Sequence, residues 1–359
     1  MIGGNPGYVI KDGKKLRCGF TTGSCAAGAA KAAAMMLRGE EPDSVEIDTP
    51  AGVLLKLVIS SRRMEKDQAV CSIIKDAGDD PDVTDGIEIF ARVRKRQDGR
   101  VLITGGEGIG IITRKGFFGE VGEYAINKVP REMIRSELKK VGDFGYDVEI
   151  FAPEGVEKGK RTFNENIGIQ GGISIIGSTG IVQPMSEKAL LDTIFLEMDQ
   201  IKLDHGTNGL LLVPGNHGEK IARKEGINLP SVKMSNYVGE SIQYAYGIGF
   251  RSMTILGHVG KLSKLSIGAF NTHSRICDIR LEAFIYHLAL METPIGFLNQ
   301  VEKCLTAEEA LHLCLDHGYG QVARKMESSA EERIRRYLKD DGIEIKVTIY
   351  SMERGVCPC

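Results

Sequence analysis

Two histidines and three cationic residues lie within eighteen positions in the second half of the sequence: His258, Lys261, Lys264, His273 and Arg275. They follow the apolar run 253–256, which predicts a strand ending just before the cluster. Cations form strong hydrogen bonds with carboxylates, so a polycarboxylate ligand suits this cluster. A neutral histidine also transfers protons near pH 7. An isolated histidine is usually a core or surface group, but a cluster at a strand end favours a functional site.

A hydroxyl-rich turn precedes an alanine-rich helix near the start of the chain. Residues 19–27 read GFTTGSCAA and place Thr21, Thr22 and Ser24 at the expected helix start. Free N–H groups at a helix start attract carboxylates and phosphates, so these hydroxyls are candidates for substrate binding. A well-capped helix with Ser24 as its N-cap explains the segment equally well.

An acidic segment, residues 76–85, carries five carboxylates in ten residues, among them Asp80. Divalent metal binding, general-base chemistry or attraction of a cationic ligand would each use such a cluster. The spacing does not match an EF-hand loop. Aspartates also favour turns through their own backbone hydrogen bonds, so a solvated turn remains the default interpretation.

Two glycine turns follow apolar runs, as in nucleotide-binding units. The run 171–180, GGISIIGSTG, resembles a first strand and turn, although the spacing is not GxGxxG; the run 210–213 precedes a second turn. Tight strand-to-helix turns are the alternative explanation. The candidate cofactor-binding residues are Gly177, Ser178, Thr179, Gly180, Gly215 and Asn216.

A shorter basic group, Lys128 and Arg131, lies at the start of a predicted helix. These side chains are candidates for contacts with acidic groups of a ligand. Arginines are nevertheless common on the exposed surface at a helix start, so the signal is weak.

The overall composition excludes several classes of partner. The 359 residues carry 46 basic and 48 acidic side chains, so no global field favours nucleic acid or an anionic membrane. No apolar stretch of membrane-spanning length and no export signal is present. Eight scattered cysteines fit reduced thiols in the cytoplasm, and the Cys357/Cys359 tail alone does not close a zinc site.

The length predicts two domains. Residues 1–160 contain β-like runs and two helices, at 24–37 and 131–140, which indicate an α+β sandwich. Residues 161–359 alternate strand, glycine turn and helix, which predicts a Rossmann-like α/β domain with a mainly parallel sheet. Capping boxes at Thr306 and Ser329 predict the starts of two late helices.

Six segments in register resemble the cobalt-precorrin-5B C1-methyltransferase family of cobalamin biosynthesis. Ser24 and Lys128 depart from the family pattern, and Asn164-Glu165-Asn166 replaces a stretch often holding Asn-Pro-Arg. The matching segments are GFTTGSCAAGAAKAA at 19–33, DAGDDPDVT at 76–84, GEGIGIIT at 106–113, AINKVPREMI at 125–134, GIQGGISIIGSTGIVQPMS at 168–186 and GHVGKLSKLSIGAFNTHSR at 257–275.

The resemblance implies an α+β domain joined to a Rossmann-like domain. It also implies methyl transfer from S-adenosyl-L-methionine to ring carbon C1 of cobalt-precorrin-5B, giving cobalt-precorrin-6A in the early-cobalt pathway. The cobalt belongs to the substrate, so no metal held by the protein is expected. A homo-oligomer is compatible with the sequence.

Methyl transfer from a sulfonium needs alignment more than covalent help, followed by loss of a proton. The candidate bases are His258, His273 and Asp80, in that order. Three alternatives stay open. The chain is a methyltransferase that acts at another ring position or on a metal-free precorrin, a tetrapyrrole carrier without methyl-donor binding, or a metal-dependent phosphate enzyme that uses residues 76–85.

Overall fold

The computed structural model describes residues 6–114 and 119–356, and the Cys357/Cys359 tail lies outside this range. The chain divides into two compact units, Met1–Glu187 and Lys188–Cys359, both of mixed α/β structure. None of the described helices is both long and apolar enough to cross a membrane.

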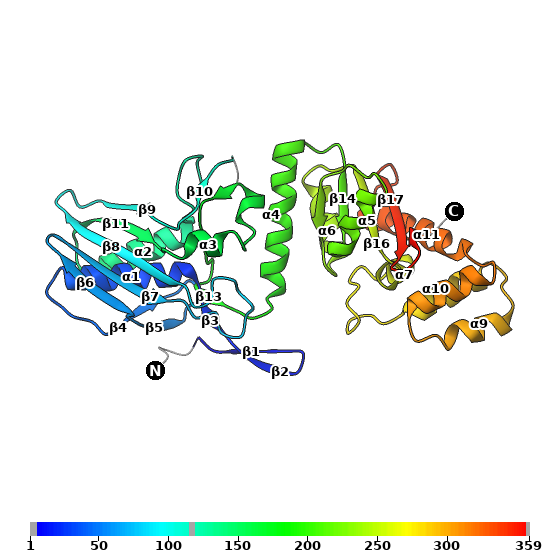
Figure 1. Ribbon diagram of the computed structural model, residues 1–359, viewed down its shortest axis with the longest axis horizontal. Coiled ribbons are helices and arrows are strands. Elements are labelled where there is room, and N and C mark those ends of the chain that lie inside the picture. The colour runs from blue at the N-terminus through cyan, green and yellow to red at the C-terminus, as the bar shows by residue number, and fades with distance from the viewer. Residues whose placement is uncertain (1–5, 115–118, 357–359) are drawn as a thin grey trace. The chain divides into compact units, whose positions relative to one another are not determined.

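A five-stranded sheet with the order β6-β7-β8-β11-β9 forms the framework of the first unit (Figure 1). All its pairs are antiparallel except β11 with β9. Two helices, α1 and α2, pack together, and α1 lies against β7 and β8. These elements are β6 (Ser61–Glu65), β7 (Gln68–Ile74), β8 (Glu88–Arg96), β9 (Val101–Gly105), β11 (Gly145–Phe151), α1 (Thr22–Met36) and α2 (Lys128–Val141).

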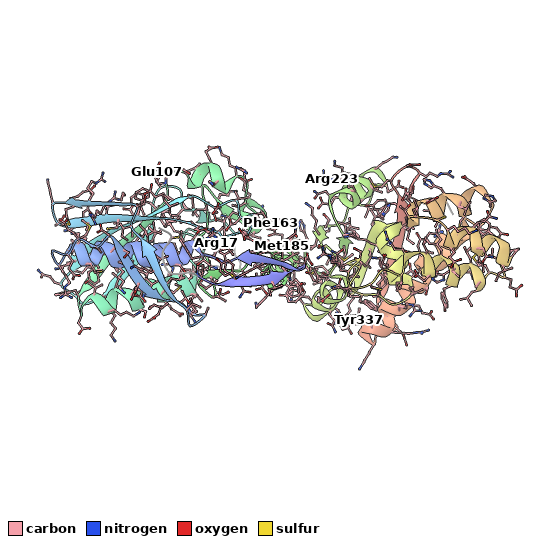
Figure 2. The ribbon with its side chains drawn as sticks, turned by 90° about the horizontal axis from the view of Figure 1, so that it is seen from below. Arg17, Glu107, Phe163, Met185, Arg223 and Tyr337 are labelled. Atoms are coloured by element: carbon pink, nitrogen blue, oxygen red, sulfur yellow. The ribbon has the colours of Figure 1, made fainter. Side chains whose placement is uncertain are left out.

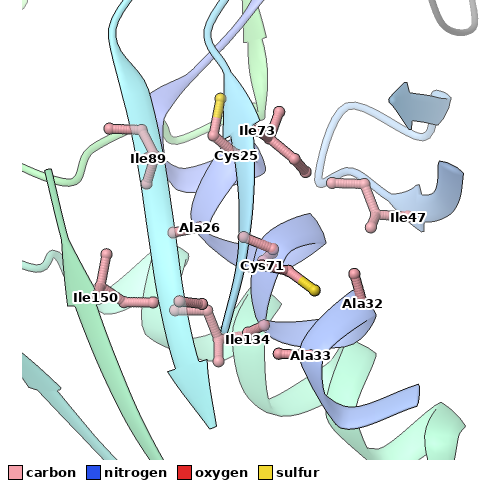
Figure 3. Close-up of a cluster of buried hydrophobic side chains, with 14 of the residues drawn as sticks. Cys25, Ala26, Ala32, Ala33, Ile47, Cys71, Ile73, Ile89, Ile134 and Ile150 are labelled. Atoms are coloured by element: carbon pink, nitrogen blue, oxygen red, sulfur yellow. The ribbon is translucent and has the colours of Figure 1, made fainter. Parts of the chain in front are cut away.

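Helix α1 is buried on nearly every side because its residues are small. Its alanines are fully buried, and Ile73 and Leu57 side chains approach so closely that a methyl group at Gly28 would lie 2.6 and 2.8 Å from them. Figure 3 shows α1 alanines beside Ile73, Ile89 and Ile150 of the sheet. A helix of larger residues would not fit between the sheet and its other neighbours.

Short strands, one short α-helix and one 3₁₀ helix complete the first unit. They form the hairpins β1-β2 and β4-β5 and the pairs β10-β12 and β13-β3. Their bounds are β1 (Tyr8–Lys11), β2 (Lys14–Arg17), β3 (Gly19–Phe20), β4 (Ser44–Asp48), β5 (Leu54–Val58), β10 (Ile111–Ile112), α3 (Gly155–Gly159), η1 (Asn164–Ile167), β12 (Ile169–Gln170) and β13 (Ile181–Val182).

The unit boundary lies after residue 187, whereas the sequence pattern predicts it after residue 160. Residues 161–187 belong to the first unit because β12 pairs with β10 and β13 pairs with β3. Ile173 and Ile175, expected in the first strand of the second domain, instead form isolated bridges with Ile109 and Ile126 and are buried in the first core. The apolar alternation marked a buried segment but carried no information about which core it joins.

The second unit is built on a sheet with the order β15-β14-β16-β17-β18, parallel except for β18. Helices cover both faces, which explains why all four residues of β14 are buried. Leu211 and Val213 pack in a small cluster with Ala222 of α5, while Leu210 and Leu212 join the larger core. The strands are β14 (Leu210–Val213), β15 (Ser231–Lys233), β16 (Ser252–His258), β17 (Glu344–Ser351) and β18 (Gly355–Val356).

Helix α4 precedes β14, and α5, α6 and α7 follow β14, β15 and β16 (Figure 1). Helices α8 to α11 then form a group that comes before β17 in the chain. Thr306 is the N-cap of α10 as the capping box predicts, but Ser329 lies inside α11 and donates to the carbonyl of Ser266. The helices are α4 (Glu187–His205), α5 (Asn216–Lys224), α6 (Val238–Gly247), α7 (Val259–Ser266), α8 (Arg280–Ala289), α9 (Ile295–Glu302), α10 (Ala307–Asp316) and α11 (Gln321–Leu338).

Side chains of α11 satisfy the backbone of one side of β17. Within the described residues, β18 pairs only with Tyr350 and Ser351. Further back along the strand, Glu327 accepts the N–H of Ile349 and Glu331 accepts that of Val347, at 2.7 and 2.9 Å. Arg335, one turn further along α11, donates to the carbonyls of Ile343 and Ile345. Three side chains spaced four residues apart therefore replace a neighbouring strand.

Replacing Glu331 with leucine should lower the free energy of unfolding by about 1–3 kcal/mol, because the N–H of Val347 loses its acceptor. Glu331→Gln keeps an acceptor oxygen and should cost less than about 1 kcal/mol. Urea denaturation of the full chain measures both. If both variants lost the same free energy of unfolding, the hydrogen bond from Val347 to Glu331 would not be the stabilising contact.

Candidate functional site

A cavity of about 600 Å³ lies within the second unit at the carboxyl ends of its parallel strands. Asn236 follows β15, His258 ends β16 and Met352 follows β17, and all three line the cavity. The chain runs from β14 outward to β15 and then crosses to β16 on the other side of β14. Ligands of open α/β sheets bind at such a reversal of strand order, outside the carboxyl ends.

Two lysines, the buried Lys264 and the half-buried Lys261, give the cavity its positive charge. The Lys264 side chain is only 2% exposed, and its Nζ donates to the carbonyl of Thr272 at 3.0 Å. Lys261 Nζ donates to Oδ1 of Asn236 at 2.8 Å. Neither ammonium forms an ion pair with a carboxylate among the described residues, so both rely on neutral acceptors.

Burial lowers the pKa of both lysines. For Lys264 the nearby Arg280 adds to this effect, and for Lys261 the ammonium of Lys264 does. Each charge is thus held in an environment that opposes it, which an anionic ligand would relieve. The cavity is consequently suited to a carboxylate or another small anion.

Glu308, in the first turn of α10, ties together the ends of β16 and β17. Its Oε2 lies 2.6 Å from Nε2 of His258, and its Oε1 accepts from the Ser351 hydroxyl and, at 2.8 Å, from the N–H of Met352. Burial alone would raise the pKa of this carboxyl, but the hydrogen bonds from Ser351 and His258 outweigh it and lower the pKa. Glu308 is therefore ionised at neutral pH.

Both histidines of the cavity use Nδ1 to accept a backbone hydrogen bond. His258 is the N-cap of α7 and accepts the N–H of Gly260 at 3.1 Å, and His273 accepts that of Arg275 at 3.2 Å. In each neutral ring the proton consequently lies on Nε2. The arrangement makes both side chains hydrogen-bond donors and leaves neither a free lone pair for general-base chemistry.

The remaining predicted residues of this unit lie near the cavity or at the adjoining strand end. Arg275 is in the same loop as His273 but is not among the lining residues. Gly215 and Asn216 follow β14, which neighbours β16 in the sheet. Gly215 has extended backbone and no atom within 4 Å of the position of a Cβ, so its flank is open.

In the first unit, the predicted substrate-binding residues at 21–24 form hydrogen bonds with the segment 174–180, which contains the predicted cofactor turn. Thr22 Oγ1 donates to carbonyls of residues 174 and 176, and Ser24 Oγ donates to the carbonyl of Gly180 at 2.7 Å. The N–H groups of Thr21 and Gly23 donate to the carbonyls of Gly180 and Ile176. The start of α1 therefore has few free donors for an anion, with Thr21 rather than Ser24 as its N-cap.

The glycines of the turn are required by this packing. A Cβ at Gly177 would lie 2.3 Å from Oγ1 of Thr21, and Gly180 has a φ of +79°. Thr179 Oγ1 donates to the carbonyl of Ile181, and the N–H of Ala51 donates to the carbonyl of Thr179. The turn from Gly177 through Ser178 and Thr179 to Gly180 thus packs against the start of α1 within the first unit.

The acidic segment is a hydrogen-bonded turn. Asp76 forms a two-bond pair with Arg17 (labelled in Figure 2), and Asp82 lies 2.6 Å from the ammonium of Lys75, which is 2% exposed. Asp80 Oδ1 accepts the N–H of Met185 at 2.9 Å. Among the described residues no group of three or more His, Cys, Asp or Glu side chains is arranged to hold a metal ion. These carboxylates support the loop and its neighbours.

The two basic residues at the start of α2 have different surroundings: Lys128 is exposed, and Arg131 binds backbone carbonyls. Lys128 is 89% exposed and lies 3.9 Å from Glu132. Arg131 donates to the carbonyls of Ile126 and Ile103 at 2.7 and 2.9 Å, and burial lowers its pKa. Arg131 therefore fixes two backbone segments, and Lys128 is left on the surface.

Comparison with known proteins matches the CbiD family over residues 9–184 and its C-terminal domain, "CbiD, C-terminal domain", over residues 271–358. A cobalt-precorrin-5B C(1)-methyltransferase from Alkaliphilus oremlandii is 60% identical over 97% of this chain and 98% of its own length. The chain belongs to the CbiD family. The enzyme of the same name from Treponema denticola is 56% identical over 97% of this chain and 98% of its own length.

A crystal structure of a cobalamin biosynthesis protein (cbiD) from Archaeoglobus fulgidus is 27% identical to this CbiD family chain. It covers 76% of this chain and 87% of its own, with a TM-score of 0.42.

Sequence reasoning missed three charged residues that line the cavity of this CbiD family member: Arg280, Glu308 and Glu353. Glu308 follows the N-cap of α10 and has the sequence signature of an ordinary first-turn acid. Arg280 and Glu353 lie outside the recognised motifs. Only their position at the strand ends reveals them, and that position depends on the fold of the second unit.

Replacing Asp82 with asparagine should destabilise the first unit by about 3–5 kcal/mol, because the buried Lys75 loses its counter-ion. Burial alone would raise the pKa of Asp82, but the charge and hydrogen bond of Lys75, together with hydrogen bonds from Thr84, lower the pKa below its usual 3.8. This stabilisation is thus present above pH 3.8 and is lost as the pH falls through the lower folded-state pKa. Thermal melts between pH 3 and 7 test both expectations.

Asp79→Asn is the matched control, since Asp79 accepts the N–H of Arg17 and asparagine keeps an acceptor oxygen. It should cost less than about 1 kcal/mol. If both variants lost the same stability, the Lys75–Asp82 pair would not be the stabilising contact.

Proposed function

We propose that the chain transfers the methyl group of S-adenosyl-L-methionine to C1 of cobalt-precorrin-5B, giving cobalt-precorrin-6A. The observation that carries this proposal is near-complete alignment with relatives that bear the name of that enzyme, at up to 60% identity over 97% of this chain. The cavity adds support, because its cations suit a carboxylate, which both the tetrapyrrole and the methyl donor carry.

The reaction breaks the bond between sulfur and the methyl carbon and forms a carbon–carbon bond at C1. The sulfonium leaves as the neutral thioether S-adenosylhomocysteine, and the macrocycle releases one proton. The donor is already activated, so the protein's task is to align sulfur, methyl and C1 in a line and to exclude water. Cobalt enters and leaves as part of the substrate.

The second unit is, by this proposal, a Rossmann-like domain that binds ligands at the carboxyl ends of β14, β15, β16 and β17. His258 and His273 act there as hydrogen-bond donors, because Nδ1 of each accepts a backbone N–H. Asp80, the third candidate base, supports the backbone at Met185 in the first unit. We assign the enzyme to the cytoplasm, as expected for a biosynthetic methyltransferase.

The decisive experiment is anaerobic incubation of the purified protein with cobalt-precorrin-5B and methyl-labelled S-adenosyl-L-methionine. Mass spectrometry and NMR then locate the label, which we expect at C1. Label at another carbon would change the assigned position. Tetrapyrrole binding without transfer or methyl-donor binding would instead indicate a carrier.

His258→Asn should retain turnover within about tenfold of wild type, because asparagine also caps a helix and the ring has no free lone pair. The variant loses the contact with Glu308 Oε2, but Ser351 and Met352 still hold Oε1 of Glu308 at the end of β17. Removal of a true general base lowers turnover by about 10²–10⁴-fold. Single-turnover transfer of the labelled methyl group measures the difference. A loss in the larger range would show that His258 accepts the proton after all.

A further inference from the structure

The cavity at the strand ends carries charges of both signs. Lys261, Lys264 and Arg280 line it, and so do Glu308 and Glu353. The two glutamates repel the acid groups of a ligand that carries only carboxylates. A ligand with adjacent positive and negative groups satisfies both sets.

The three cationic residues of the cavity differ in whether they already have a carboxylate partner. Arg280 has its own carboxylate, Asp278, at 2.7 Å. Lys264 is almost fully buried and, among the described residues, has only the carbonyl of Thr272 as acceptor, so two of its three ammonium hydrogens are available to a ligand. Lys261 lies one turn earlier on the same helix, and both side chains line the cavity.

Of the two glutamates that line the cavity, one has a carboxylate that is available to a ligand. Both oxygens of Glu308 are engaged, by His258 on one side and by Ser351 and Met352 on the other. Glu353 is 75% exposed at its side chain and lies 3.5 Å from Nδ1 of His312. Glu353 is therefore the acid best able to meet a positive group of a ligand.

We propose that this cavity binds the amino-acid end of the methyl donor. Lys261 and Lys264 hold its carboxylate, and Glu353 meets its α-ammonium. This assignment rests on the proposed function and deepens it, because it gives the two lysines to the donor and not to the acid side chains of the tetrapyrrole.

The position in the sheet agrees with this assignment. The cavity adjoins the end of β16, and β14 is the next strand, where the open flank of Gly215 leaves room for a ligand. The nucleoside part of the donor extends along the carboxyl edge toward that turn. This is the direction in which ligands lie across the strand reversal of open α/β sheets.

The test compares two ligands that differ in the amino-acid end. S-adenosylhomocysteine carries the carboxylate and ammonium, whereas 5′-methylthioadenosine lacks both. Their dissociation constants are measured by calorimetry on the full chain and on Lys264→Met. We expect the variant to bind S-adenosylhomocysteine about 10- to 100-fold more weakly, as for loss of a charge-assisted hydrogen bond, and to bind 5′-methylthioadenosine unchanged.

Methionine has nearly the length of lysine and removes a buried charge, so Lys264→Met should fold. Lys261→Met provides a second, independent variant with the same expectation. Lys325→Met, on the exposed surface of α11, is the control for loss of one positive charge and should leave both constants unchanged.

Three outcomes would overturn the assignment. Equal weakening of both ligands would place the lysines away from the amino-acid end. Unchanged binding of S-adenosylhomocysteine, together with a raised KM for the tetrapyrrole, would give the lysines to the tetrapyrrole acids. If wild type bound neither nucleoside, the proposed function itself would fall, a result distinguishable because no variant is needed to see it.

Discussion

The hydrogen bonds at the Glu308 carboxylate are the interaction on which the candidate site depends. One oxygen holds the ring of His258 at the end of β16, and the other holds Ser351 and Met352 at the end of β17. Since His258 also caps α7, the same contact fixes the helix that carries Lys261 and Lys264. Two strands and two helices are thus positioned by one half-buried acid whose own charge is stabilised by the groups it orients.

Several strands of the second unit were predictable from the sequence, because each is an apolar run followed directly by a glycine turn. Apolar runs followed by glycine turns gave the strands β14 and β16, and the cluster from His258 to His273 proved to line one cavity. The roles within it were less accessible, because the hydrogen bonds to Nδ1 that fix each ring's tautomer come from the turn geometry. Ser329 illustrates the same limit: it has the sequence of a cap but lies within α11, where tertiary packing continues the helix.

The first unit shows why dense motifs need not mark a site. Thr22, Ser24 and the turn ending at Gly180 stand far apart in the sequence, yet each is the other's hydrogen-bonding partner. Hydroxyls and glycines suit ligand binding and close backbone packing equally well, so composition alone could not decide between them. The same holds for the aspartates around Lys75, whose buried charge explains why Asp82 lies beside it.

The contacts between α11 and β17 have a consequence for the protein's behaviour in concentrated solution. A strand with unpaired amides and carbonyls is a template on which another chain can add a strand, and this leads to aggregation or exchange of segments between molecules. Glu327, Glu331 and Arg335 occupy those groups with side chains that no incoming backbone can displace without leaving charges unpaired. The helix therefore blocks the addition of another strand along this part of β17.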